Sequence, residues 1–431
     1  MKVIILFYRS QLIHKTMYGH VQGVYYPDEG GKTFLCTTWP DVEKYVIEPR
    51  AVICYGTNLG SEVDRTTCNT TLKYMYNHMR CGIYVLILEG KLAMFAPFAN
   101  ASYENNFDMS MSTSLEKYSQ TKAAAFKKPL EVLLPLKKWW TNAGGIMCNV
   151  MPLDVWGDYM LSEHKQFLLQ ICGQVQDCEF ILNKRDHPQL RKDLTEAYAH
   201  CFYGKQQPLP EEYQTAMLPI VSGYTGPLFL DVAWPLPCDM VKTKPSSRPW
   251  HVRTSAAIFR GSSTGSIPNN VRMDLCLLST LHPQILDAKL TAWNSRDRLV
   301  MGQVTALCPD PRLQLAPRMS MDQQQAFKYA VYVEGHSAAS RYLQLMLHGF
   351  VIIKVDTRHT TADQLWYFDQ LVEGVDHVRV AADLSNLIPC IHWLREHDDL
   401  ALAMSLKAQE LGARIVASQT QYAINTLNAF K

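Results

Sequence analysis

The stretch KYAVYVEGHSAASRYLQLMLHGFVIIKV, residues 328–355, decides the fold. An apolar run at 329–333 leads into a turn of small residues that opens at Gly335, and a second apolar run follows at 350–355. The pattern predicts a βαβ unit, with Arg341 in the early turns of its helix. Amides at a helix start lack partners and face the positive end of the helix dipole, so we expect an anion such as phosphate at this turn.

A second unit of the same kind precedes it. The apolar run at 256–259 meets RGSSTG at 260–265, and a helix is expected from about residue 270, with Arg272 in its first turn. Hydroxyls and glycines in such a turn let a phosphate approach closely, although an ordinary strand-to-helix turn has the same composition. Two such turns with Arg272 and Arg341 would clamp a diphosphate without a metal ion.

The remaining pattern alternates strands and helices. A hairpin is expected at 82–98 with its turn at Glu89-Gly90, a helix within 154–173, strands at 178–183 and 377–380, and a helical C-terminus. This order predicts an α/β fold with open parallel sheets, in which ligands bind outside the carboxyl ends of the strands.

Composition limits the classes of function. With 431 residues, two domains are expected, and 42 Lys plus Arg against 40 Asp plus Glu disfavour a nucleic-acid partner. The 12 cysteines form no C-x-x-C pair, which favours free thiols in a reducing compartment. The N-terminal apolar run is too short for a secretory segment or a membrane span. We therefore expect a cytoplasmic protein that is not secreted.

Three further features have alternative interpretations. Asp186, in NKRDHPQ after the strand at 178–183, fits a general base, but from these residues alone a loop aspartate that caps a helix or pairs with Arg185 is the favoured interpretation. His336 lies at the mouth of the phosphate turn and either acts there or packs. The aromatic run at 366–368 either stacks on a base or sugar or belongs to the core. No P-loop, paired metal carboxylates or D-x-D pair occurs, so no metal is expected.

Five motifs carry a resemblance to a known family. They are IYVLILEGKLAMF, CEFILNKRDHPQL, FRGSSTG with VRMDLCLLS, KYAVYVEGHSAASR, and HVRVAADLSNL with IHWLREHDD, in this order between about Cys81 and Ala417. The chain resembles glycosyltransferase family 90, the group of capsule-associated and protein O-glucosyltransferases. Segments such as PFANASYENNF and DVWGDYML look most similar to members from large DNA viruses and algae.

The resemblance implies a GT-B architecture, in which two Rossmann-like domains face each other across a cleft. It implies inverting, metal-independent transfer of a sugar from a UDP-sugar to a hydroxyl of a protein or glycan acceptor, with glucose or xylose as the first candidates. Asp186 matches the family's catalytic base. The positions that match its nucleotide-sugar site are Ser262, Arg272, His336, Ser337, Ala338, Ala339, Ser340 and Arg341.

The expected domains are a β-rich extension at 1–70, an N-terminal Rossmann-like domain at 71–235, a nucleotide-sugar-binding domain at 236–405, and a helix at 406–431 that packs back on the N-terminal domain. No cofactor beyond the UDP-sugar substrate is expected. The alternative is a catalytically weak or inert relative that serves as an interaction component, for example among virion or capsid proteins. The sequence does not fix the sugar, the acceptor or the oligomeric state.

Overall fold

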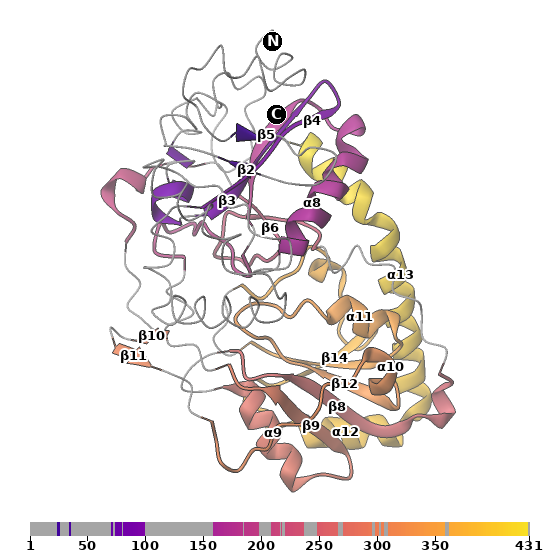
Figure 1. Cartoon of the computed structure of the whole chain (residues 1–431). Helices are drawn as coiled ribbons and strands as arrows, with labels where there is room; N and C mark the ends of the chain where they lie inside the picture. Colours follow the sequence, from indigo (N-terminus) through magenta and orange to yellow (C-terminus); the bar gives the residue numbers. More distant parts are fainter. Residues whose placement is uncertain are drawn as a thin grey trace, which may run out of the picture. The chain divides into compact units, whose positions relative to one another are not determined.

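The structure is a computed structural model of the whole chain (Figure 1). It describes residues 24–25, 34–35, 70–71, 74–79, 81–99, 158–183, 185–197, 208–215, 217, 220–236, 248–265, 270–294, 298–300, 303–305, 309–357 and 362–429. The chain divides into two compact units. Unit 1 comprises Met1–Lys184, Leu209–Val221 and Ala423–Lys431; unit 2 comprises Arg185–Pro208 and Ser222–Tyr422. The domain limits given above stay a prediction.

Unit 2 is built on a parallel sheet of five strands in the order β14-β13-β12-β8-β9. The strands are β8 (Thr254–Ser262), β9 (Leu286–Ala292), β12 (Phe327–Tyr332), β13 (Val351–Val355) and β14 (His377–Val380). In β8, β12 and β13 the apolar runs are buried on both faces and show no polar alternation, whereas the edge strand β9 alternates buried apolar with more exposed polar residues. The expected open parallel sheet is confirmed in this unit.

Helices cover both faces of this sheet. On one face, α9 (Val271–Leu281) and α12 (Leu387–Glu396) pack in one apolar cluster with the strands, and Figure 1 shows both helices beside β8 and β9. On the other face, the ring of Tyr332 in β12 meets that of Tyr342 in α11 (Tyr342–Leu347) at a centroid distance of 4.8 Å. The result is the doubly wound layering of α/β proteins.

The strand order reverses between β8 and β12. The chain runs from β8 outward to β9, then returns past β8 to β12 and continues outward on the other side through β13 and β14. The helices that follow the two central strands, α9 and α11, therefore lie on opposite faces, and ligands of doubly wound sheets bind at the strand ends between such helices. The two turns at which the sequence predicts a bound anion, here called the anion-type turns, follow these two strands.

The C-terminal helix α13 (Asp398–Asn428) confirms the expected helical C-terminus and continues through Gly412. A side chain there would place its Cβ 3.1 Å from the Cβ of Met346 and 3.3 Å from the Cδ2 of Leu347. Glycine thus allows α13 to lie directly on α11.

Unit 1 contains the predicted hairpin. Strands β3 (Cys81–Leu88) and β4 (Lys91–Ala99) pair antiparallel, and Glu89 and Gly90 both have positive φ, as a tight hairpin turn requires. Strand β5 (Cys178–Leu182) pairs antiparallel with β3 and parallel with β6 (Val221–Ser222). The described sheet here is mixed rather than parallel, so the architecture of two Rossmann-like domains across a cleft stays a prediction.

Helix α8 (Asp158–Ile171) of unit 1 confirms the helix expected within 154–173. The smaller elements are β1 (Val24–Tyr25), β2 (Phe34–Leu35), β7 (Val232–Ala233), β10 (Arg298–Val300), β11 (Gln303–Thr305), α10 (Met321–Gln324), and the short helices η1 (Tyr74–His78), η3 (Cys172–Gln174), η5 (Glu211–Tyr213), η7 (Trp250–Val252) and η8 (Phe368–Gln370). Apart from β1, β2 and residue 70, the β-rich extension expected at 1–70 lies outside the described residues.

One predicted helix start is wrong. The turn after Gly335 does not open directly into a helix, because α11 begins only at Tyr342, after Arg341. The amide of Ala338 donates to the carbonyl of Ala362 (2.8 Å), and the amide of Ala339 donates to the hydroxyl of Tyr332 (2.7 Å). These partners hold residues 335–341 as a compact loop.

Candidate functional site

Arg272 joins the two turns at the reversal of strand order. Its Nη1 donates to the carbonyl of Ser262 (3.1 Å), the last residue of β8, and to Oγ1 of Thr264 (2.5 Å) in the turn that follows. Its Nε and Nη2 donate to the carbonyls of Glu334 and Val333, at 2.9 Å each, in the turn after β12. Most of the donors of this guanidinium are therefore occupied by the protein itself.

Gly335 makes this close approach of the two turns possible. A Cβ at this position would lie 2.8 Å from Oγ1 of Thr264 and 3.2 Å from Nη2 of Arg272. No ordinary Cβ contact is so short, and the turns would have to separate. The glycine after β12 is thus required by packing against the β8 turn, without any need for positive φ.

The start of α9 is satisfied within the protein. The side chain of Asn270 accepts from the amides of Arg272 and Met273, each at 3.1 Å, and its own amide donates to the carbonyl of Ser263 (2.9 Å). This is an N-cap. It fixes Arg272 in the first turn of α9, with its side chain directed at the β12 turn.

Arg341 lies beside Arg272. Its guanidinium is 6.0 Å from the centre of the Phe259 ring, that of Arg272 is 5.8 Å from the same centre, and Nη1 of Arg341 donates to the carbonyl of Arg260. Burial and the neighbouring Arg341 lower the pKa of Arg272 to about 9, and burial lowers the pKa of Arg341. Both groups remain cationic at neutral pH, and a bound anion would relieve their repulsion.

Glu334 is a polar group of this site that sequence reasoning missed. Its side chain is buried, and neither carboxylate oxygen accepts a hydrogen bond of ordinary geometry from a described residue. Burial raises its pKa to about 7, while Thr357, Lys354 and Arg272 oppose that rise. The acidic residue directly before Gly335 was the available signal in the sequence.

His336 connects three segments of unit 2. Its Nδ1 accepts from the amide of Gly265 (3.3 Å), its Nε2 lies 2.9 Å from Nδ2 of Asn294, and its ring centre is 6.2 Å from that of His187. The residue thus bridges the two anion-type turns and also touches the loop that carries Asp186.

The structure therefore gathers most of the predicted site. Ser262, Arg272, His336 and Arg341 lie at the two turns, and Asp186 is an exposed residue of the loop whose His187 contacts His336. In the β12 turn, Ser337 and Ala338 are buried, and Ala339 and Ser340 are partly exposed. The carbonyl of Ser337 accepts from the amide of Gly335 (3.0 Å).

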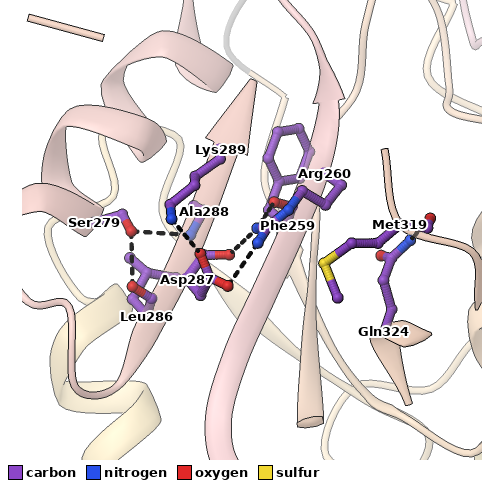
Figure 2. A network of polar contacts seen from close by, with 9 residues as sticks. All are labelled: Phe259, Arg260, Ser279, Leu286, Asp287, Ala288, Lys289, Met319 and Gln324. Carbon is purple, nitrogen blue, oxygen red and sulfur yellow. Dashed lines mark hydrogen bonds and ion pairs between the residues drawn. The ribbon is translucent and has the colours of Figure 1, made fainter. Parts of the chain in front are cut away.

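Arg260 and two residues of the aromatic run at 366–368 have structural roles. Arg260 of the RGSSTG motif donates to the carbonyl of Asp287 (2.7 Å) and to its carboxylate (2.6 Å), and so ties β8 to β9, as Figure 2 shows. In the aromatic run at 366–368, Trp366 and Tyr367 are buried, and Trp366 lies 4.6 Å from the ring of Tyr422. The core interpretation of that run holds for these two residues.

Within the described residues, no group of three or more His, Cys, Asp or Glu has a metal-binding arrangement. Four described cysteines have free thiols, namely Cys172, Cys178, Cys276 and Cys390. Among the helices of the described ranges, none combines the length and apolar character needed to span a bilayer.

Unit 2 is thus a doubly wound α/β unit, and the turns after β8 and β12, which meet Arg272 and Arg341, lie at the switch point, where its strand order reverses. A family model of glycosyl transferase family 90 matches residues 156–424, and the chain belongs to this family. The match contains both turns and the Asp186 loop. It confirms the resemblance stated from the motifs.

Relatives include viral and animal proteins. An uncharacterized protein of Invertebrate iridescent virus 3 is 31% identical over 83% of this chain and 36% of its own length, and one of Frog virus 3 is 29% identical over 76% and 38%. Protein O-glucosyltransferase 1 of Homo sapiens is 26% identical over 60% of this chain and 61% of its own. This chain thus spans little more than a third of the two viral relatives.

Solved structures give weaker likenesses. TarM matches 44% of this chain and 38% of its own at 15% identity with a TM-score of 0.29. Anabaena HepE in complex with UDP-glucose matches 41% of each chain at 12% identity with a TM-score of 0.26. Neither likeness establishes a shared fold.

Proposed function

We propose that this protein is an inverting, metal-independent glycosyltransferase that moves a hexose or pentose from a UDP-sugar to a hydroxyl of a protein or glycan acceptor. The observation that carries the proposal is the pair of guanidiniums, Arg272 and Arg341, held between two turns at the switch point of a parallel sheet. Ligands of such sheets bind at this position, and two adjacent cations fit a diphosphate.

In the proposed reaction, an acceptor hydroxyl oxygen attacks the anomeric carbon from the face opposite the UDP. A bond forms between that oxygen and the carbon, the bond from the carbon to the β-phosphate oxygen breaks, and the electron pair leaves with UDP. Asp186 takes the proton of the hydroxyl. The single displacement inverts the configuration at the carbon.

Arg341 and the β12 turn, His336 to Ser340, would stabilise the charge that develops on the departing diphosphate, and Ser262 would contact it from the β8 turn. Preorganised cations of this kind stabilise the negative charge of the leaving group as a divalent metal ion would. Arg272 would act mainly by holding both turns in place, because most of its donors already bind protein oxygens.

Glucose is the first candidate for the transferred sugar, because one relative is named Protein O-glucosyltransferase 1. Xylose is the second, since it lacks only the hydroxymethyl group, and pockets discriminate such a difference by only about 1–3 kcal/mol. The GT-B arrangement, with an acceptor domain facing unit 2 across a cleft, belongs to the same proposal.

The test is a screen of UDP-sugars for slow hydrolysis by the purified protein, together with calorimetric titration of UDP. Asp186→Asn should lower turnover by about 10²- to 10⁴-fold and leave UDP affinity unchanged. Asp383→Asn, at another exposed loop aspartate of unit 2, is the control and should keep full turnover. Absence of UDP binding at millimolar nucleotide would refute the proposal and favour an inert interaction component.

A further inference from the structure

A buried carboxylate lies directly behind the Asp186 loop. Asp231 is 6% exposed and accepts three hydrogen bonds. Its Oδ1 accepts from the amide of Gln189 (2.7 Å) and the hydroxyl of Ser222 (2.5 Å), and its Oδ2 accepts from the amide of Leu190 (2.8 Å). One side chain therefore fixes two consecutive amides that follow Asp186 by three and four positions.

The same segments are joined by main-chain bonds. The amide of Leu230 donates to the carbonyl of Leu190 (2.8 Å), and the amide of Lys192 donates to the carbonyl of Leu228 (2.9 Å). Within the loop, Nε2 of Gln189 donates to the carbonyl of His187 (2.5 Å), so the residue after Asp186 is tied to the clamped segment. Asp186 is exposed, whereas Gln189 is fully buried.

The arrangement requires a carboxylate. Two amides and a hydroxyl donate to both oxygens of Asp231, so an asparagine would turn its NH₂ group toward one of the donors and lose that bond. Burial raises the pKa of Asp231 to about 7, and the hydrogen bonds from Ser222, Gln189 and Leu190 oppose the rise. A buried charge of this kind is costly unless it is fully hydrogen-bonded, which makes a mere packing role a poor explanation.

We propose that Asp231 is a positioning residue that holds the Asp186 loop at the reacting hydroxyl. This inference rests on the proposed function, in which Asp186 is the base. A general base must stand within hydrogen-bond distance of its proton, and a displacement of about 1 Å can lower a rate about 10²-fold. Asp231 contacts neither the guanidiniums nor the β12 turn through its hydrogen bonds, so its loss should leave nucleotide binding intact.

The experiment compares the wild-type chain of 431 residues with Asp231→Asn and the milder Ser222→Ala. The control is Asp376→Asn, which alters another buried aspartate of unit 2, one that accepts from the amide of Val372 and pairs with His377. Three properties are measured: hydrogen exchange of the amides of residues 185–192, kcat and KM for UDP-glucose hydrolysis, and UDP affinity by calorimetry.

Asp231→Asn should speed exchange at Gln189 and Leu190 at least tenfold and lower kcat about 10- to 100-fold, with KM and UDP affinity within twofold. Asp376→Asn should change none of these values. If Asp231→Asn does not fold, Ser222→Ala decides, with about fivefold effects on both exchange and kcat.

The inference is overturned if exchange at Gln189 and Leu190 does not change, if it rises while kcat stays constant, or if Asp376→Asn lowers kcat equally. A wild type that hydrolyses no UDP-sugar would refute the proposed function instead. The exchange experiment would still confirm or overturn the clamp on the loop.

Discussion

Replacing Gly335 by alanine tests whether the contact between the two turns builds the site. The new Cβ would lie 2.8 Å from Oγ1 of Thr264, 3.2 Å from Nη2 of Arg272 and 3.4 Å from Cβ of Thr264. Overpacking costs about 1–3 kcal/mol, and the lower entropy of the unfolded chain returns about 0.4–1 kcal/mol. We expect a net loss of about 1–2 kcal/mol in the free energy of unfolding and about tenfold weaker UDP binding.

A second substitution separates this cause from others. Thr264→Ala removes the nearest atom but also removes a hydrogen bond to the Arg272 guanidinium, which costs about 1.5–3 kcal/mol. In the double variant the clash is partly relieved, because the contact with Arg272 remains. The combined loss should therefore be smaller than the sum of the single losses by about 1 kcal/mol.

Chemical denaturation and UDP calorimetry on the four proteins of this cycle provide the measurement. Gly173→Ala is the matched control, because its nearest neighbour, the carbonyl oxygen of Gly90, is 4.0 Å away and the change should be neutral or slightly stabilising. Strict additivity of the two substitutions, or full UDP affinity in Gly335→Ala, would refute the argument that close packing of the turns forms the binding site.

Three further changes test the charges and the packing. Arg341→Gln should weaken UDP binding by about 10- to 100-fold in calorimetry, whereas Arg379→Gln at an exposed position should not. Because burial raises the pKa of Glu334 from 4.5 unfolded to about 7 folded, this residue's contribution to the free energy of unfolding should fall by about 3 kcal/mol as pH rises from 4.5 through 7. In denaturant titrations across this range, Glu334→Gln should show a decline smaller than that of the wild type by this amount, while the contribution of buried Asp231 remains. Gly412→Leu should lower the free energy of unfolding by about 2 kcal/mol through its contact with α11, against no change in exposed Ala413→Leu.

Elements whose signals are local were predictable from the sequence. The Glu89-Gly90 turn and the start of α9 at Asn270 depend on residues within a few positions of each other, namely a pair that accepts positive φ and a side chain that caps its own helix. The parallel sheet followed from apolar runs buried on both faces. The start of α11 was missed, because the partners of the loop amides, Tyr332 and Ala362, cannot be paired by pattern.

The sequence predicted which residues belong to the site better than it predicted their roles. Two turns after adjacent parallel strands must meet at one sheet edge, which places Arg272 and Arg341 together. What Arg272 binds could not be inferred, since three of its four acceptors are main-chain carbonyls that any residue supplies. Asp231 was missed for a similar reason, because two of its three donors are main-chain amides.

The charges of the site favour an anionic ligand, and this argument does not depend on any sequence motif. Burial and, to a smaller extent, the neighbouring Arg341 lower the pKa of Arg272. The described hydrogen bonds of both guanidiniums go to carbonyl and hydroxyl oxygens rather than to carboxylates. The carboxyl of Glu334, which lies close enough to interact with Arg272, is itself shifted toward its neutral form by burial. Neither cation is thus fully compensated within the described site, and a diphosphate between the two turns would supply the missing negative charge.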